Sequence, residues 1–232
     1  MDLYITGIKR THVFKGSLPV NELYKGSVRV WRRENAPTIT GFTAVPSSID
    51  LDSSSPANIT LSFQVAGTSG QVTNAHIVRV SDGVNIGQRY VSGPGVGISE
   101  SFTVPRPTKN ETYRLIASND NGSAHSDQAV SVTQNAVISG FRRTGFQQVP
   151  GLQAGTFVFQ ATIRGYPQPA LSYRFGNARQ GAITARHLTA TANSNEWTLN
   201  WSIYHTVLSD SLVLTATNSS NTTTSTINNI SN

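Results

Sequence analysis

Short runs in which apolar and polar residues alternate occur along most of the chain. Residues 59–65 alternate throughout, and residues 98–104 alternate except at Glu100 before the run stops at Pro105. A period of two places successive side chains on opposite faces, as in a strand with one buried side. The other runs of this type are residues 75–80, 112–117, 129–132, 157–163, 171–175, 197–203 and 212–216. No stretch combines helical periodicity with caps, so the pattern predicts an all-β chain.

Turn signals separate these runs at short intervals. Ser81-Asp82-Gly83 follows the run at 75–80 and indicates a hairpin. Tyr166-Pro167-Gln168-Pro169 indicates a rigid turn before the run at 171–175. Several short alternating strands with turns every 8–12 residues are typical of β-sandwiches.

Two short patterns occur twice at a constant offset. Ile39-Thr40-Gly41-Phe42 matches Ile138-Ser139-Gly140-Phe141, and Leu115-Ile116-Ala117-Ser118-Asn119 matches Leu214-Thr215-Ala216-Thr217-Asn218. Both pairs are 99 residues apart, since 138 − 39 and 214 − 115 give the same difference. We therefore predict two copies of one domain, residues 35–134 and 135–232. Asn35-Ala36-Pro37 marks the start of the first copy, because Pro37 cannot donate a ladder hydrogen bond.

Residues 1–34 lie outside both copies. They hold two similar units, Val13-Phe14-Lys15-Gly16-Ser17-Leu18 and Leu23-Tyr24-Lys25-Gly26-Ser27-Val28, and each has Gly-Ser turn chemistry. The second unit continues as a half-buried strand pattern to Trp31. Isolated hairpins are marginal in water, so we expect this segment to pack on the first copy or on another subunit.

The net charge of +6 is unevenly distributed. Residues 1–34 carry seven basic and three acidic side chains. Residues 35–134 carry five basic and seven acidic side chains, and residues 135–232 carry six basic and two acidic ones. A basic arm can bind nucleic acid. Here the basic residues alternate with Tyr, Val and Trp in strand order, which favours a strand with a solvated basic face over a nucleic-acid site.

Composition narrows the expected setting. The chain has no cysteine, so disulfides and thiolate metal sites are excluded, and we expect folding in a cytosol. The first residues lack the pattern of a signal peptide. No apolar run reaches membrane-spanning length, so no membrane partner is expected.

No residue pattern indicates catalysis, a cofactor or a metal. The histidines are scattered: His12, His76, His125, His187 and His205. Asp50 and Asp52 are too few for calcium, which takes six to eight oxygens, and indicate a turn with charged edges. Glu196 and Asp210 are the only acidic residues of the second copy. A glycosidase pair needs further converging groups, so we expect no enzyme, no cofactor and no metal.

Aromatic residues could form a surface for glycans. Trp197, Leu199 and Trp201 share one face of a strand and are interpreted as a core stripe. Tyr90, Tyr166 and Tyr204 lie near turns and are candidates for a receptor or glycan surface.

The string Tyr113-x-Leu115-x-Ala117-x-Asn119-x-x-Gly122 resembles the penultimate strand of immunoglobulin-like domains. The resemblance puts Tyr113 at the tyrosine corner, Leu115 at the usual cysteine and Gly122 at a left-handed turn. In the second copy Leu212, Leu214 and Asn221 take these places, and Asn also tolerates a left-handed turn. The resemblance covers residues 36–232 and implies two tandem immunoglobulin-like β-sandwiches. Cysteine-free modules of this kind are frequent in bacterial adhesins and phage virion proteins.

Residues 23–31 resemble the Tyr-x-Gly-Ser-x-x-Val-Trp strings of tailed-phage structural proteins. This implies a virion structural protein of the tail or baseplate, or a head decoration, assembled in the host cytoplasm. Residues 1–34 would dock by strand addition onto other virion proteins, in multiple copies of a symmetric assembly. The expected buried contacts are Tyr24, Val28, Val30 and Trp31, and the expected charged contacts are Lys25, Arg29, Arg32 and Arg33. The two domains would project outward and touch a host surface or glycan weakly. The alternative is a bacterial adhesin or carbohydrate-binding module.

Overall fold

The computed structural model describes most of the chain from Ala36 onward. These described residues are 36–53, 56–66, 74–90, 97–119, 121–152, 154–176, 179–206 and 211–228. Before Ala36 it describes the backbone of short strands within residues 3–32. Strands dominate throughout, and one 3-10 turn, η1 (Ala185–His187), interrupts them. Within the described part, no helix has the length and apolarity needed to cross a membrane.

The chain folds into two compact units. Unit one contains residues 1–47, 57–106 and 110–130, and unit two contains residues 48–56, 107–109 and 131–232. The strand β14 (Gly122–Gln148) supplies its first part to unit one and the rest to unit two. The boundary predicted from the repeat, between residues 134 and 135, falls inside this strand.

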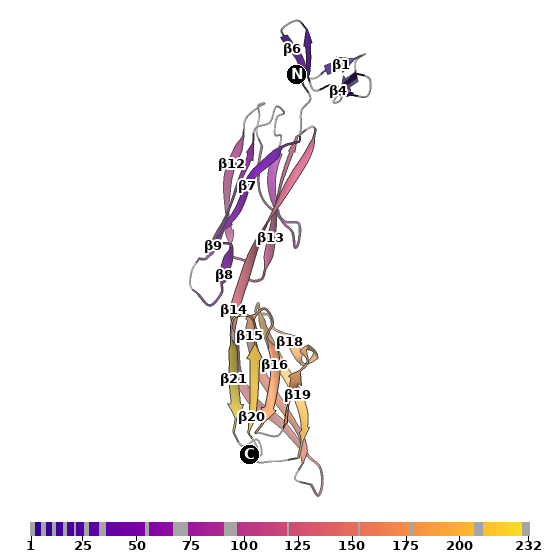
Figure 1. Ribbon diagram of the computed structural model, residues 1–232. Coiled ribbons are helices and arrows are strands. Elements are labelled where there is room, and N and C mark those ends of the chain that lie inside the picture. Colours follow the sequence, from indigo (N-terminus) through magenta and orange to yellow (C-terminus); the bar gives the residue numbers. More distant parts are fainter. Residues whose placement is uncertain are drawn as a thin grey trace. The chain divides into compact units, whose positions relative to one another are not determined.

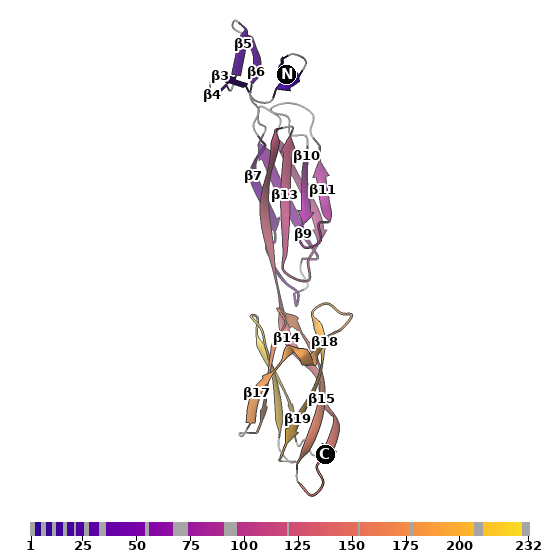
Figure 2. The same ribbon diagram turned by 90° about the vertical axis from the view of Figure 1, so that its right-hand side faces the viewer.

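Unit one is built from two sheets. One sheet has the order β12-β9-β7, and the other places β11, β10, β13 and the first part of β14 side by side (Figures 1 and 2). Alternate residues of β9 and β13 face inward, and Leu61, Phe63 and Leu115 are at most 2% exposed. The strand bounds are β7 (Thr38–Val45), β9 (Asn58–Ala66), β10 (Asn74–Arg79), β11 (Asn85–Arg89), β12 (Ile98–Pro105) and β13 (Glu111–Asn119).

Unit two repeats this architecture. One sheet has the order β14-β15-β19-β18 and the other β17-β16-β20-β21 (Figure 1). This is the ABED and CFG arrangement of an immunoglobulin-like sandwich, with one additional strand beside C. The bounds are β15 (Gly155–Tyr166), β16 (Ala170–Phe175), β17 (Arg179–Ile183), β18 (Leu188–Ala190), β19 (Glu196–His205), β20 (Leu212–Thr217) and β21 (Thr222–Ile227). In addition, β8 (Ser48–Asp50) pairs in parallel with residues 131–133 of β14.

The all-β prediction is confirmed, and each long alternating run lies in a strand. The runs at 59–65 and 98–104 became β9 and β12, and those at 157–163 and 197–203 became β15 and β19. The run at 129–132 lies within β14, which continues to Gln148. The pattern missed β8, β11, β17, β18 and β21, because these strands are short or mostly polar. It also missed β7, whose pairing with β9 shifts register between Ile39 and Gly41.

The repeated Ile-x-Gly-Phe pattern marks a β-bulge in both copies. The pairing of β7 with β9 shifts register between Ile39 and Gly41. The pairing of β14 with β15 shifts between Ser139 and Arg142, around Gly140, whose φ is +59°. A bulge inserts an unpaired residue and bends the strand, and glycine tolerates its left-handed form. The repeated Ile-x-Gly-Phe pattern therefore coincides with an irregularity of the backbone in both copies.

The second repeated pattern ends in an asparagine that turns the chain. The backbone N–H of Asn121 donates to Asn119 Oδ1 at 2.9 Å, and 99 residues later Ser220 donates to Asn218 Oδ1 at 2.9 Å. An Asn side chain that bonds the backbone two residues on imitates a backbone turn. Asn218 also donates through Nδ2 to the carbonyl of Gln134 at 2.7 Å. The same side chain therefore ties the turn after β20 to β14.

Gly122 and Asn221 hold the same repeat position but differ in backbone conformation. Gly122 has a φ of +148°, as only glycine readily adopts. Asn221 was expected to be left-handed, and this was wrong, because among the described non-glycine residues only Asn195 has a positive φ. Instead the Asn221 side chain clamps Ala136: Oδ1 accepts from its N–H at 2.6 Å and Nδ2 donates to its carbonyl at 3.1 Å.

Replacing Asn221 by alanine should destabilise unit two. Ala136 is 1% exposed, so its N–H and carbonyl would lose partners in a buried position. We expect a loss of about 1–3 kcal/mol in the free energy of unfolding, measured by urea denaturation. Asn221→Asp keeps the acceptor and loses the donor, so its loss should be intermediate. A loss for Asn221→Ala no larger than that of an exposed surface substitution would contradict the clamp.

Tyr113 is buried, as expected from its motif position, at 2% exposure. Burial raises the pKa of its hydroxyl, and the charge of Glu111 raises it further. However, its hydroxyl forms no hydrogen bond with the residues that the structure describes, so the bond of a tyrosine corner is not formed there. Tyr113 stabilises unit one through the packing of its ring.

The β10–β11 hairpin confirms the predicted turn at Ser81-Asp82-Gly83. Gly83 has a φ of +71°, and the Asp82 carboxylate accepts two hydrogen bonds from Arg79 Nε and one from Nη2 at 2.6 Å. These hydrogen bonds lower the pKa of Asp82 below its ordinary value. Asp82 Oδ1 also accepts the N–H of Val84 at 3.2 Å.

The ion pair of Asp82 should make a small contribution to stability that depends on pH. A lowered carboxyl pKa in the folded state stabilises above the unfolded pKa, about 3.9, and this contribution is lost as the pH falls through the folded pKa. Asp82→Asn should therefore lower the Tm slightly at pH 7. It should leave the Tm unchanged at a pH below the pKa of Asp82 in the folded protein. Both groups are well exposed, so a large effect at pH 7, or a gap that persists in acid, would contradict this account.

Candidate functional site

The described strands before residue 33 form three short antiparallel pairs, each a hairpin. The pairs are β1 (Leu3–Ile5) with β2 (Ile8–Arg10), β3 (Val13–Lys15) with β4 (Leu18–Val20), and β5 (Glu22–Lys25) with β6 (Val28–Arg32). Each hairpin is a separate two-stranded sheet, and none of these strands pairs with another sheet of the described chain. Each therefore presents an unpaired backbone edge within the part that the structure describes.

The hairpins recur every ten residues. Tyr4, Phe14 and Tyr24 precede the turns, and Ile8, Leu18 and Val28 follow them. The sequence predicted the second and third hairpins from their Lys-Gly-Ser strings. It missed the first, because Thr6-Gly7 places glycine one position later than the other two turns do. The period of ten in the aromatic and apolar positions was the signal that could have found it.

The expected docking residues fall on the third hairpin. Tyr24 and Lys25 belong to β5, where they pair with Arg29 and Val28 of β6. Val30, Trp31 and Arg32 complete β6. The side chains of these residues, and the whole of Arg33, lie outside the described residues. The structure therefore brings the backbone of seven of the eight together on one hairpin, and their contacts stay a prediction.

The described part of the chain contains no group of three or more His, Cys, Asp or Glu side chains placed to hold a metal ion. Asp50 and Asp52 lie at a turn as expected, where Asp50 Oδ1 accepts the N–H of Asp52 at 3.0 Å. Asp52 also accepts the N–H of Asn135 and pairs with Arg164 at 3.5 Å. These carboxylates have structural partners within unit two.

Two of the tyrosines considered for a glycan surface, Tyr166 and Tyr204, lie far apart in unit two. Tyr204 of β19 pairs with Thr156 near the start of β15, whereas Tyr166 ends the same strand ten residues later. At about 3.3 Å per residue, these two tyrosines are roughly 30 Å apart. Tyr90 belongs to unit one, where it is 64% exposed. In the tryptophan stripe, Leu199 and Trp201 are buried in the core as expected, and Trp197 is half-buried.

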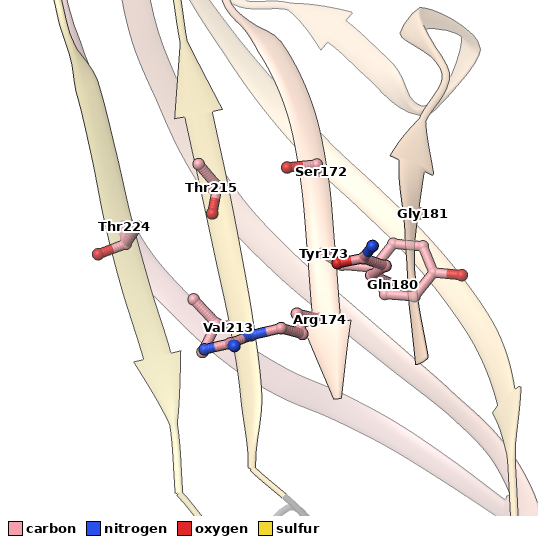
Figure 3. A pocket seen from close by; sticks show the side chains of 8 residues that line it. All are labelled: Ser172, Tyr173, Arg174, Gln180, Gly181, Val213, Thr215 and Thr224. Carbon is pink, nitrogen blue, oxygen red and sulfur yellow. The ribbon is translucent and has the colours of Figure 1, made fainter. Parts of the chain in front are cut away.

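A shallow groove of about 470 Å³ lies on the β17-β16-β20-β21 sheet of unit two. It is lined by Ser172, Tyr173, Arg174, Gln180, Gly181, Val213, Thr215 and Thr224 (Figure 3). In the close-up the Arg174 side chain lies across β20 beside Val213, and the Tyr173 ring extends toward β17. The sequence gave no indication of this groove, because its residues come from four strands and each strand contributes only a few of them.

Most polar side chains in the groove have no hydrogen-bond or ion-pair partner among the residues that the structure describes. The Arg174 guanidinium makes no ion pair or hydrogen bond with a described residue, and the same holds for the side chains of Ser172, Thr215, Thr224 and Gln180. By contrast, Arg179 of the same sheet donates to the carbonyl of Tyr204 at 2.7 Å. The four strands contain no Asp or Glu. The groove thus offers one cation and several free hydrogen-bonding groups.

Comparison with known proteins yields structural neighbours alone. No family model matches the sequence, and no curated protein matches it. The titin segment Titin-A168169 is similar over 84% of this chain and 97% of its own, with 16% identity and a TM-score of 0.47. Bovine butyrophilin is similar over 81% of this chain and 98% of its own, with 10% identity and a TM-score of 0.44. This chain is all-β, and the order of the strands in its sheets is that of two tandem immunoglobulin-like β-sandwiches.

Proposed function

We propose that the protein is a non-catalytic structural component of a tailed-phage virion, in the tail or baseplate or as a head decoration. The first 34 residues attach it to other virion proteins, in multiple copies of a symmetric assembly, and the immunoglobulin-like domains are displayed. The observation that supports this best is the set of three hairpins that pair only within themselves among the described strands. Hairpins of this size need further packing to be stable.

Strand addition fits the chemistry of this segment. An unpaired strand edge has a row of N–H and carbonyl groups that can extend a partner's sheet. The seven basic side chains of residues 1–34 outnumber the three acidic ones, which favours an acidic partner surface. The Tyr-x-Gly-Ser-x-x-Val-Trp resemblance of residues 23–31 supports a virion partner.

Deletion of residues 1–34 tests the attachment. Particles purified from cells that make the truncated chain should lack it, and mass spectrometry should find the full-length chain at a constant copy number. A triple substitution of Lys25, Arg29 and Arg32 by glutamine should reduce incorporation, whereas Arg89→Gln, in unit one, should not. Normal incorporation of the truncated chain would refute the docking role. The Tm of the truncated chain shows whether its sandwiches still fold.

The second candidate is a binding module of a bacterial adhesin or a carbohydrate-active protein. The polar groove of unit two is the observation that favours it. Specific glycan binding by a chain that is absent from every particle preparation would select this alternative over the virion component.

A further inference from the structure

We propose that the groove on the β17-β16-β20-β21 sheet binds a carboxylated sugar, with Arg174 as the group that holds the carboxylate. This site is separate from the hairpins of residues 1–34 and does not depend on the virion assignment. The inference rests on the charge, the free hydrogen-bonding groups and the size of the groove.

The charge of the groove favours an anion. Arg174 is exposed and makes no ion pair with the residues that the structure describes, and its own sheet has no carboxylate to offer. Arg114 of unit one, whose side chain is partly exposed, shows the contrast: the Asp127 carboxylate accepts hydrogen bonds from its Nε at 2.7 Å and its Nη2 at 2.8 Å. A guanidinium can hold a carboxylate by two parallel hydrogen bonds. Arg174 is free to form such a fork with a ligand.

The other groups in the groove fit a ligand rich in hydroxyls. Ser172, Thr215, Thr224 and Gln180 supply donors and acceptors that form no hydrogen bond with the described residues. By contrast, the hydroxyls of Thr217 in β20 and Thr222 in β21, outside the groove, form a hydrogen bond with each other at 3.1 Å. A sugar ring presents hydroxyls at several angles, which such a set of side chains can satisfy together.

Size and backbone pairing argue against a peptide strand in the groove. About 470 Å³ is within the range of small-ligand sites. The strands β16 and β20 are each paired on both sides, so their backbone groups are used in the ladders. Val213 is the one aliphatic side chain that lines the groove, so an apolar anchor residue would find little to contact.

The Tyr173 ring lies on the core face of β16, opposite the face that carries Ser172 and Arg174. Its ring is half-buried, with its centroid 4.7 Å from that of Trp201. A Cβ at Gly181 would lie 3.0 Å from both Cε1 and the hydroxyl oxygen of Tyr173. The missing side chain at Gly181 therefore leaves room for the ring beside β17 on the core face of the sheet, so the polar side chains of Ser172, Arg174 and Gln180 carry the recognition (Figure 3).

The test compares D-glucuronate with D-glucose, which differ only in a carboxylate against a hydroxymethyl group. Two-dimensional NMR titration of the full chain should show glucuronate shifting the amides of residues 172–174, 213–215 and 224, with a Kd in the millimolar range. Glucose should bind at least tenfold more weakly. Acetate, which has the carboxylate without the ring, should also bind at least tenfold more weakly.

Variants assign the site to Arg174. Arg174→Gln should weaken glucuronate binding at least tenfold, the loss expected for one charge-assisted contact, and Arg174→Lys should be intermediate. Arg142→Gln is the matched control, because Arg142 is exposed on the other sheet of unit two and bonds Gln160 at 2.8 Å. Since Arg174 is exposed, its variants should keep the wild-type Tm.

Three results would overturn the proposal. The first is no shift of the groove amides at about 50 mM glucuronate, which is far above the expected Kd. The second is equal binding of glucuronate and acetate, which would show a general anion site without sugar recognition. The third is unchanged binding by Arg174→Gln, which would place the ligand elsewhere. The deletion of residues 1–34 tests the proposed virion role alone. Its outcome does not change what the glucuronate experiments say about the groove.

Discussion

Leu115→Ala should unfold the first sandwich at least about 10 °C below its normal Tm and leave the second sandwich unchanged. Leu115 is 0% exposed and lies in β13 among the core residues of unit one. Removal of a buried leucine side chain costs about 2–5 kcal/mol, from lost burial and the cavity that remains. For a domain of this size, each kcal/mol shifts the Tm by about 4–8 °C.

Leu214→Ala is the matched experiment 99 residues later. Leu214 is also 0% exposed, in β20 of unit two, and its loss should lower only the Tm of the second sandwich. Differential scanning calorimetry and NMR signals assigned to each unit can separate the two transitions. Leu→Met at either site keeps most of the volume and should cost less than about 1.5 kcal/mol. If either alanine variant lowered both transitions equally, the two units would not have separate cores.

The fold could be predicted largely because its strands are long and half-buried. In β9 and β15, buried and more exposed residues alternate along the strand, so the period of two was visible in the sequence. The 99-residue offset could also be interpreted, because the duplicated patterns coincide with a bulge and an asparagine turn. The strand β21 was missed, since Thr222–Ile227 carries hydroxyl residues on both faces and a single large apolar residue at its end.

Gly122 and Asn221 hold equivalent positions in the two copies, but their backbone conformations differ. A left-handed turn was the local expectation for Asn221, because asparagine tolerates that conformation. The structure instead uses the amide to bond both backbone groups of Ala136, 85 residues away in sequence. A local rule has no access to that contact, because Ala136 lies in β14 of one sheet and Asn221 lies between β20 and β21 of the other.

The candidate sites differ in how far the sequence reveals them. The third hairpin of the N-terminal segment was visible, because its turn and strands are contiguous. The groove was not visible, because Ser172, Gln180, Thr215 and Thr224 become neighbours only through the order β17-β16-β20-β21. One sequence signal was present: the four strands lack acidic residues, and β21 contains five hydroxyl residues in succession. That signal has meaning only once the four strands are known to form one sheet.

Phe159→Ala should remove a large part of the stability of the second sandwich. Phe159 is 0% exposed in β15, and its ring centroid lies 5.6 Å from that of Trp201, 5.9 Å from Phe141 and 6.2 Å from Phe157. A buried phenylalanine replaced by alanine costs about 3–5 kcal/mol, a large part of the 5–15 kcal/mol typical of a domain. Aromatic pairs add to this cost beyond their buried area. Urea denaturation monitored by tryptophan fluorescence should show an early transition, and the NMR signals of unit one should persist.

The adjacent Val158 provides the control for this prediction. Val158 lies in the same strand, but its side chain is on the opposite face and is 38% exposed. Val158→Ala should therefore change the free energy of unfolding by less than about 1 kcal/mol, as exposed substitutions usually do. Phe159→Leu retains part of the volume and should fall between the two alanine variants. If Phe159→Ala cost no more than Val158→Ala, the aromatic side chains between the two sheets would not be the core on which unit two depends, and the strand alternation in β15 would have been assigned to the wrong face.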